Sequence, residues 1–327
     1  MLVILSMLAL LIFPDTASHA VRSGLLLCGT TVIPALFPFL VLSRLLIGIL
    51  PKRIPKWSDR LMERCFGVSG ACFPAMFISF LGSYPVGVSA VVSLYEAGAI
   101  PRQDAQRAIR FCNNSGPGFF IGIVGGVIFR SASAGLALYL CHILSAFLCG
   151  FLFSEPKQQI AVRRTVQTSA PLSELFLCSI ADTCTVLLQL CGMILAFSLV
   201  STYLNLFHIS DLPETVQAFL LGSLELTTGI LHLSDSSVSF VCAAFLMSWG
   251  GLCVHMQAKN LWVRAGLKIR GYFTAKLLQG CFSALFALVY LRPSVQNLAA
   301  AAFFASICII FPYFRKKYGG NLRRHAV

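Results

Sequence analysis

The sequence has few charged residues, and this scarcity sets its class. Only 11% of its 327 residues are Asp, Glu, Lys or Arg, whereas a soluble protein carries about 25%. Apolar residues make up 57% of the chain, and the mean hydropathy is +0.82. These values exclude an ordinary soluble protein and predict an all-α polytopic membrane protein, with residues 1–327 forming a single integral membrane domain.

The usual catalytic and metal-binding motifs are also missing. No Cys-x-x-Cys pair occurs among the thirteen cysteines, so the sequence predicts neither a zinc site nor a disulfide framework. It contains no His-Glu-x-x-His, no Gly-x-Ser-x-Gly, no paired carboxylate dyad and no P-loop. We therefore predict no enzymatic activity, no catalytic residue, no metal, and no cofactor other than a coupling H⁺ or Na⁺.

Acidic residues are scarcer than basic ones, 12 against 25, which gives a net charge of +13. The basic residues lie mostly in short loops between apolar runs, as expected from the preference of Lys and Arg for the cytoplasmic side of a membrane. This pattern does not indicate nucleic-acid binding. The expected partners are a small-molecule solute and the lipid bilayer, with a homo-oligomer as an open alternative.

The apolar stretch Met1–Phe13 has no Lys or Arg before it. A secretory signal peptide normally begins with a basic region. We therefore interpret this stretch as a short first span. Cleavage near Thr16–Ala20 is the alternative.

The apolar segment Cys65–Tyr95 has basic residues on both sides and a break, Gly82–Gly87, in its middle. The flanking basic residues are Lys52, Arg53, Lys56, Arg60, Arg64, Arg102, Arg107 and Arg110. Both ends therefore favour the cytoplasmic side, which predicts a re-entrant hairpin. Backbone freed at such a break is tolerated only inside protein or beside a water-filled cavity, which indicates a transport pathway. Two short spans or a packing kink are the alternatives.

A second interrupted segment, Val216–Leu233, has no Lys or Arg in the loops on either side. It predicts a second hairpin, entered from outside. With the other apolar runs, the sequence predicts about eight transmembrane helices plus two re-entrant hairpins, with both termini inside. The loops expected in the cytoplasm are 51–64, 96–110, 154–171 and 257–271.

The order span, hairpin, span, span occurs twice, in residues 21–153 and 172–291, with opposite orientations. The hairpins share a Leu-Gly-Ser sequence, at Leu81–Ser83 and Leu221–Ser223. Asn114–Gly116 in one repeat corresponds to Ser248–Gly251 in the other. Inverted repeats with broken helices are typical of secondary transporters, whose substrates bind near the membrane midplane.

Five blocks along nearly the whole chain resemble one family. They are Val32–Phe39, Gly82–Gly87, Phe111–Gly122, Leu224–Gly229 and Gly250–Gln257. They are similar to the motifs of YlbJ-like sporulation integral membrane proteins, in the expected order. The resemblance implies a nucleoside-recognition "gate" domain related in architecture to concentrative nucleoside transporters. It also implies a place in the bacterial cell membrane and a role in spore formation, moving dipicolinic acid across the outer forespore membrane.

Two segments supply the candidate substrate-binding residues, which are Ser83, Tyr84, Asn113, Asn114, Ser115 and Gly116. Carboxamides and hydroxyls at the entrance to an apolar span are costly unless they bind something. The N–H groups of a helix that starts at Pro85 would face an anion. A packing kink and a simple helix cap are the respective alternatives.

The candidate ion-coupling residues are Glu225, Thr227, Thr228 and Asp182. An ionisable residue inside a membrane segment is costly and functional by default. A structural pairing of Glu225 with another helix is the alternative. Lys276 and Arg44 are expected to extend to the membrane interface.

These features predict a secondary transporter for a small anionic or heterocyclic solute. The alternative is a non-transport membrane scaffold protein that is needed for maturation of the spore envelope. An intramembrane enzyme is disfavoured, because the catalytic motifs are missing.

Overall fold

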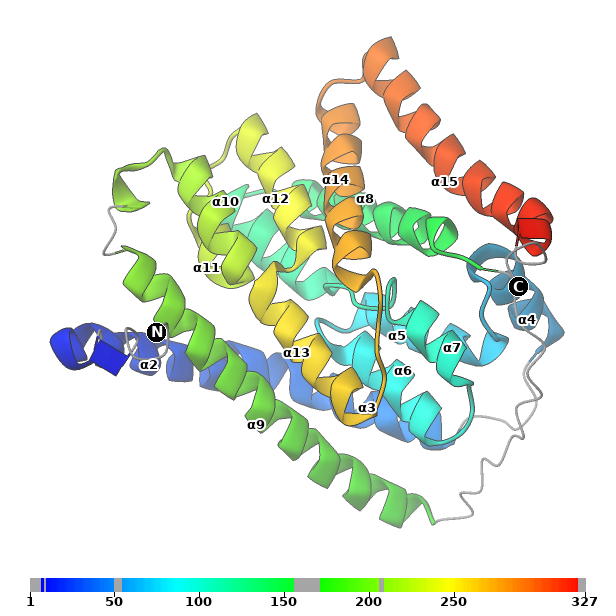
Figure 1. Ribbon diagram of the computed structural model, residues 1–327. Helices are drawn as coiled ribbons and strands as arrows, with labels where there is room; N and C mark the ends of the chain where they lie inside the picture. The colour runs from blue at the N-terminus through cyan, green and yellow to red at the C-terminus, as the bar shows by residue number, and fades with distance from the viewer. Residues whose placement is uncertain (1–6, 9, 50–54, 156–170, 206–208, 323–327) are drawn as a thin grey trace.

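The computed structural model describes residues 7–8, 10–49, 55–155, 171–205 and 209–322, and every regular element in these ranges is helical (Figure 1). The α-helices are α2 (Pro14–Leu27), α3 (Ile33–Gly48), α4 (Lys56–Phe66), α5 (Phe73–Leu81), α6 (Val86–Glu96), α7 (Arg102–Ala108), α8 (Ala132–Leu152), α9 (Leu172–Asn205), α10 (Glu214–Leu224), α11 (Leu226–Leu231), α12 (Ser237–Trp249), α13 (Gly251–Arg264), α14 (Tyr272–Leu291) and α15 (Val295–Leu322). Two π-helical segments, η1 (Cys28–Val32) and η3 (Gly118–Ile128), and two 3-10 turns, η2 (Gly70–Cys72) and η4 (Ile209–Asp211), complete the fold.

Four helical stretches in the described ranges are long and apolar enough to cross a membrane. They are α8, α9, the α12–α13 pair and α14. The count rises to six if the bent pairs α2–α3 and α4–α5 each form one span. The all-helical membrane class is confirmed, whereas the predicted eight spans are not. The expected first span, Met1–Phe13, falls mostly outside the described residues.

Helices α5 and α6 pack against each other on either side of the Gly82–Pro85 break. The backbone N–H of Ser69, before α5, donates to the carboxylate of Asp104, beyond α6, at 2.8 Å. The two ends of the segment that contains α5 and α6 therefore lie next to each other. This is the geometry of a chain that enters and returns.

Helices α10 and α11 form a second, shorter pair, interrupted at Glu225. Gly222 and Gly229 face each other so closely that a Cβ on Gly229 would overlap the backbone of Gly222. Absence of a side chain at both positions is what lets a six-residue helix fold back onto α10.

Each hairpin tip contacts a break in a later helix of the same half. Residues 113–116 are unwound before η3, and a Cβ on Gly116 would overlap the carbonyl oxygen of Gly82. Gly250 and Gly251 separate α12 from α13 with φ of +89° and +78°, a region that favours glycine. A Cβ on Gly251 would lie 2.9 Å from the carbonyl oxygen of Gly222. The two halves thus share one contact pattern, while their inverted relation stays a prediction.

The segments 96–110 and 257–271, which were expected to be loops, meet at one end of the molecule, although the first contains helix α7 and the second contains the end of helix α13. Side chains of the first segment donate to backbone carbonyl oxygens of the second at 2.6–3.0 Å, in the pairs Arg102–Gly266, Gln106–Lys268 and Arg110–Arg270. Arg107 also pairs with Glu155 at 3.3 Å. Most of the predicted connection 154–171 lies outside the described residues. The described loops expected on the cytoplasmic side therefore lie together, although the side itself stays a prediction.

The segment 51–64, expected to be a loop, contains most of helix α4. The buried residues of α4, which are Ser58, Met62 and Phe66, recur every four positions, which is the spacing of one helix face. Trp57 next to this face is 57% exposed. Charged and apolar residues therefore lie on different faces of α4, which is the pattern of a surface helix. The sequence analysis considered only the charges of this segment and did not predict the helix.

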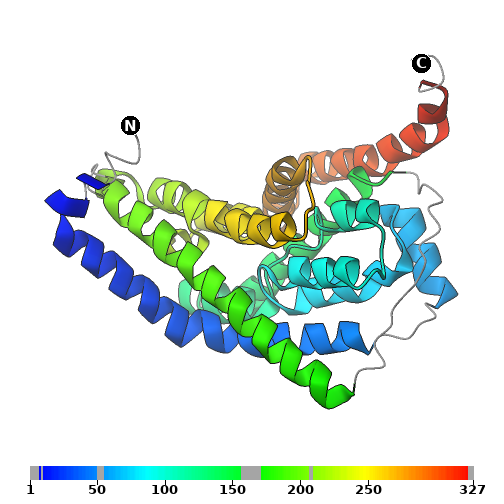
Figure 2. The same ribbon diagram turned by 60° about the horizontal axis from the view of Figure 1, so that its bottom comes forward.

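Helix α9 runs the length of α2 and α3 and packs on both (Figure 2). Helix α13 lies between α9 and α6, and α15 packs on α8 and α14, away from α9 (Figure 1). Large apolar side chains on α9 remain exposed, with Leu177 and Leu188 at 67% and 77%. A surface of this kind suits lipid rather than water.

Candidate functional site

The two hairpin tips, η1 and the unwound segment before η3 enclose a cavity of about 290 Å³. Its lining residues include Gly82, Ser83 and Tyr84 from the first tip and Glu225, Leu226 and Thr227 from the second. Thr31 and Val32 of η1 and Gly118 and Phe119 of η3 complete the wall, together with Gln257 of α13. π-Helical segments occur often at functional sites.

Four of the six candidate substrate-binding residues line this cavity: Ser83, Tyr84, Ser115 and Gly116. The polar groups sit among apolar side chains such as Leu36, Phe39 and Ile194. A mostly apolar pocket with a few polar groups is the usual form of a small-molecule site. The amide of Val86, at the start of α6, donates to the Ser83 carbonyl oxygen at 2.8 Å, so it is not free to face an anion.

The other two candidates, Asn113 and Asn114, lie behind the cavity wall and are buried. The Asn114 amide donates to Ser79 Oγ at 3.0 Å and to the Phe111 carbonyl oxygen at 2.8 Å. Its oxygen accepts from Gln279 Nε2 at 3.1 Å. Asn113 Nδ2 donates to the Tyr272 hydroxyl at 2.5 Å. These bonds hold the unwound segment against α5 and α14.

Lys276 of α14 is the residue that the sequence expectation misplaced. It was expected to extend to the membrane interface, but it is completely buried. Its Nζ donates to the Asn113 carbonyl oxygen and to Gln279 Oε1, the latter at 2.7 Å. The available signal was its position five residues into a 20-residue apolar helix, with Gln279 one turn later.

Two aromatic hydroxyls tie the first hairpin to other helices. Tyr84 donates to the Met247 carbonyl oxygen at 2.8 Å, which links the first tip to the end of α12. Tyr139 of α8 donates to the Phe80 carbonyl oxygen at 2.5 Å. On the same helix, His142 contacts the Ser115 amide at 3.3 Å and Ser248 Oγ at 2.8 Å. The wall of the cavity is therefore built from both halves of the chain.

Glu225 caps α11 at the second tip. Its carboxylate accepts from Thr227 N, Thr228 N and Thr228 Oγ1 at 3.1, 2.7 and 2.8 Å. Three of the four candidate coupling residues, Glu225, Thr227 and Thr228, are therefore in mutual contact, and Glu225 and Thr227 line the cavity. A carboxylate at a helix N-terminus is also a common structural cap.

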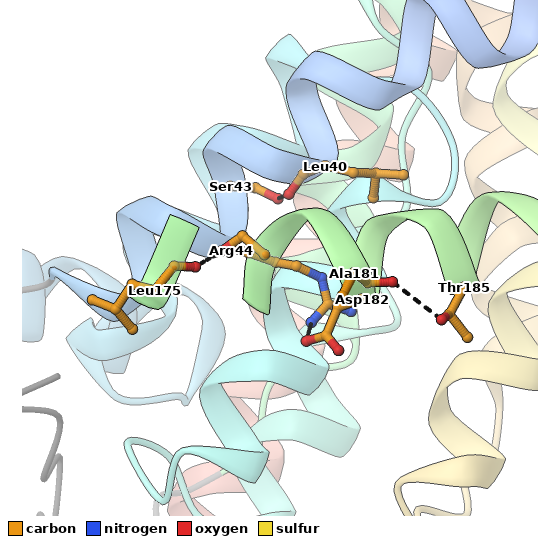
Figure 3. Close-up of polar contacts among 8 residues, drawn as sticks. Leu40, Ser43, Arg44, Leu175, Ala181, Asp182 and Thr185 are labelled. Carbon is orange, nitrogen blue, oxygen red and sulfur yellow. Dashed lines mark hydrogen bonds and ion pairs between the residues drawn. The ribbon is translucent and has the colours of Figure 1, made fainter. Parts of the chain in front are cut away.

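Asp182, the fourth candidate, lies away from the cavity. Figure 3 shows its carboxylate on α9 joined to the guanidinium of Arg44 on α3, at 2.8 Å. Its side chain is 61% exposed. Gln189, two turns further along α9, accepts from Asn260 of α13 at 2.7 Å. These contacts fasten α9 to α3 and α13 rather than completing a site at the hairpin tips.

The architecture is that of a polytopic helical membrane protein with interrupted helices around a central cavity. Its sequence is similar to the sporulation integral membrane protein YlbJ of Bacillus subtilis (strain 168), with 24% identity over 321 residues. The alignment covers 86% of this chain and 79% of that protein. This similarity supports the membership in the YlbJ-like family that the motifs indicated, and the chain is an integral membrane protein.

Two further comparisons found nothing. No protein-family model matches the chain, so the nucleoside-recognition gate domain stays an expectation. No solved structure matches it either.

Proposed function

We propose that the chain is a secondary transporter that moves a small anionic or heterocyclic solute through the cavity between its hairpin tips. Dipicolinic acid, moved during spore formation, is the solute we favour. The name of the Bacillus subtilis relative supports the link with sporulation. The resemblance of the motifs to the YlbJ-like family supports the choice of solute.

One observation carries the proposal: three separate backbone breaks, at the two hairpin tips and before η3, and the π-helical segment η1 surround one cavity of about 290 Å³. Irregular backbone in a membrane protein is tolerated where it lines a cavity or is buried in protein. Discontinuous helices that meet at a central site are the recurring device of secondary transporters. The volume lies near the lower end of the range of small-molecule pockets, about 300–1,000 Å³, and suits one aromatic ring with two carboxylates.

Flux in reconstituted vesicles tests the proposal. Purified protein in liposomes should exchange radiolabelled dipicolinate against an internal dipicolinate pool faster than protein-free liposomes do. A folded protein, monodisperse after extraction from the same liposomes, that gives no exchange would reject the transporter and favour the membrane scaffold. An unrelated sugar, carried in the same liposomes, controls for leakage.

A further inference from the structure

Lys276 is a fully buried lysine whose contacts include no carboxylate in the part of the chain that the structure describes. Its hydrogen-bond partners are a carbonyl oxygen and a carboxamide oxygen. The ion pairs Arg44–Asp182 and Arg107–Glu155 do not involve it. A lysine within an apolar span is costly to keep and marks a functional site by default.

Titratable groups near Lys276 come from several of the elements packed around it. They are Tyr84 at the first tip, Cys112 before the unwound segment, His142 and Cys149 on α8, His255 on α13 and Tyr272 on its own helix. Cys308 of α15 packs next to Cys149. None of these side chains is a carboxylate. The cluster therefore holds no permanent counter-charge for an ammonium.

Lys276 lies close to two residues of the cavity wall. Its Nζ lies 5.7 Å from the centre of the Tyr84 ring, and Tyr84 lines the cavity. It also holds the carbonyl of Asn113, two residues before Ser115, which lines the cavity as well. An anion that binds beside Tyr84 and Ser115 would thus bring a counter-charge next to the buried cluster, whereas the Glu225 carboxylate lies at the second tip and accepts from Thr227 and Thr228.

We propose that Lys276 binds the proton that accompanies an anionic solute, so that transport is coupled to H⁺. This inference rests on the proposed function. The proton binds to Nζ when the anion enters the cavity, and it leaves to water on the other side when the anion leaves. Because each binding event supplies the charge that the other needs, anion and proton favour each other's binding by the same free energy.

Proton uptake on binding tests the proposal in the purified protein. Adding dipicolinate to wild-type protein in weak buffer should remove protons from solution, up to about one for each anion bound. Measurements between about pH 6 and 8.5 keep the solute's carboxylates ionised. Lys276→Gln retains an amide donor for Asn113 and Gln279 but cannot take up a proton, so it should bind without proton uptake. Lys276→Arg, which stays charged at these pH values, serves if the Gln variant is not recovered folded.

A matched control is Lys259→Gln, the same change at an exposed lysine of α13. It should take up protons as the wild type does. In liposomes, an imposed pH gradient should accelerate dipicolinate uptake by the wild type and by Lys259→Gln, but not by Lys276→Gln.

Two results would overturn the assignment. One is binding by the wild type without proton uptake. The other is proton uptake that persists in Lys276→Gln or Lys276→Arg. If proton uptake is instead lost in Glu225→Gln, the proton binds at the second tip. Proton-linked binding without any flux would keep the assignment and reject the transporter.

Discussion

Ser83 and Asn114 look equivalent in the sequence, but the fold gives them different surroundings. Ser83 lines the cavity, whereas Asn114 is 1% exposed and bonded to Ser79 and Gln279. Removing a group from a buried network leaves its partners unsatisfied, and removing one from a cavity wall does not. Truncation of Ser83 should therefore affect solute binding, whereas truncation of Asn114 should affect the stability of the fold.

We predict that Ser83→Ala lowers dipicolinate flux with little change in stability. The loss of one polar contact, about 0.5–1.5 kcal/mol, corresponds to roughly two- to tenfold in affinity. Asn114→Ala should lower the thermal midpoint and the extracted yield, because about 1–3 kcal/mol is lost when a buried partner is left unsatisfied. Flux and thermal unfolding in detergent measure the two effects. An Asn114→Ala protein with the wild-type midpoint would contradict the buried network.

Sequence reasoning found the cavity residues at the hairpin tips but not Lys276 or the surroundings of Asp182. Ser83, Tyr84 and Glu225 lie beside backbone breaks that Gly, Pro and polar residues mark in the sequence. Asp182 sits on an uninterrupted helix, and its pairing with Arg44 spans 138 positions. A contact at that separation depends on how α3 and α9 pack, which the local sequence pattern does not contain.

At the scale of elements, the sequence predicted where helices break better than where they cross the membrane. The predicted break at Gly82–Pro85 separates α5 from α6, whereas the break at Gly250–Gly251, between α12 and α13, was not predicted. Helix α4 and the π-helical segments η1 and η3 were not predicted. Hydropathy treats an apolar run as one element, whereas a π-helix or a sharp bend forms from the packing of that run against its neighbours.

The close packing of α10 on α11 gives a prediction for this element. Gly229→Ala should separate the two helices, because its Cβ would meet the backbone of Gly222, and should cost about 1–3 kcal/mol. Gly192→Ala on α9 is the matched control, since no atom of another element lies within 4 Å of its Cβ. The control should leave the thermal midpoint unchanged or raise it slightly. Equal midpoints for the two variants would contradict the tight hairpin.

At the scale of the whole molecule, helix α14 separates two groups of loops. Its 20 residues span about 30 Å, enough to cross a bilayer core. The segments 96–110 and 257–271 meet at its start. At its end, Tyr290 stacks on Phe240, which follows the loop at 234–237. The two ends therefore correspond to the sides that the charge distribution predicted as inside and outside.

We predict that cysteines placed at Arg102 and Lys268 react with an impermeant thiol reagent from the same side of the membrane. A cysteine at Asp235 should react only from the other side. Sealed vesicles of both orientations provide the measurement, and the unsubstituted protein gives the background from its thirteen native cysteines. Labelling of Arg102→Cys and Lys268→Cys from opposite sides would contradict the second hairpin, Val216–Leu233, which lies between these two positions in the sequence. It would also contradict the contacts between the segments that carry them.

The most direct test of the account fills the cavity without disturbing the fold. Gly118 lines the cavity, and a Cβ there meets no atom within 4 Å. Gly122, one turn later in η3, has equal space but does not line the cavity. The measurement is dipicolinate uptake into liposomes by Gly118→Leu and Gly122→Leu, each checked for wild-type yield and thermal midpoint. The account predicts that Gly118→Leu loses most of its uptake while Gly122→Leu retains it, and wild-type uptake by a folded Gly118→Leu protein would contradict it.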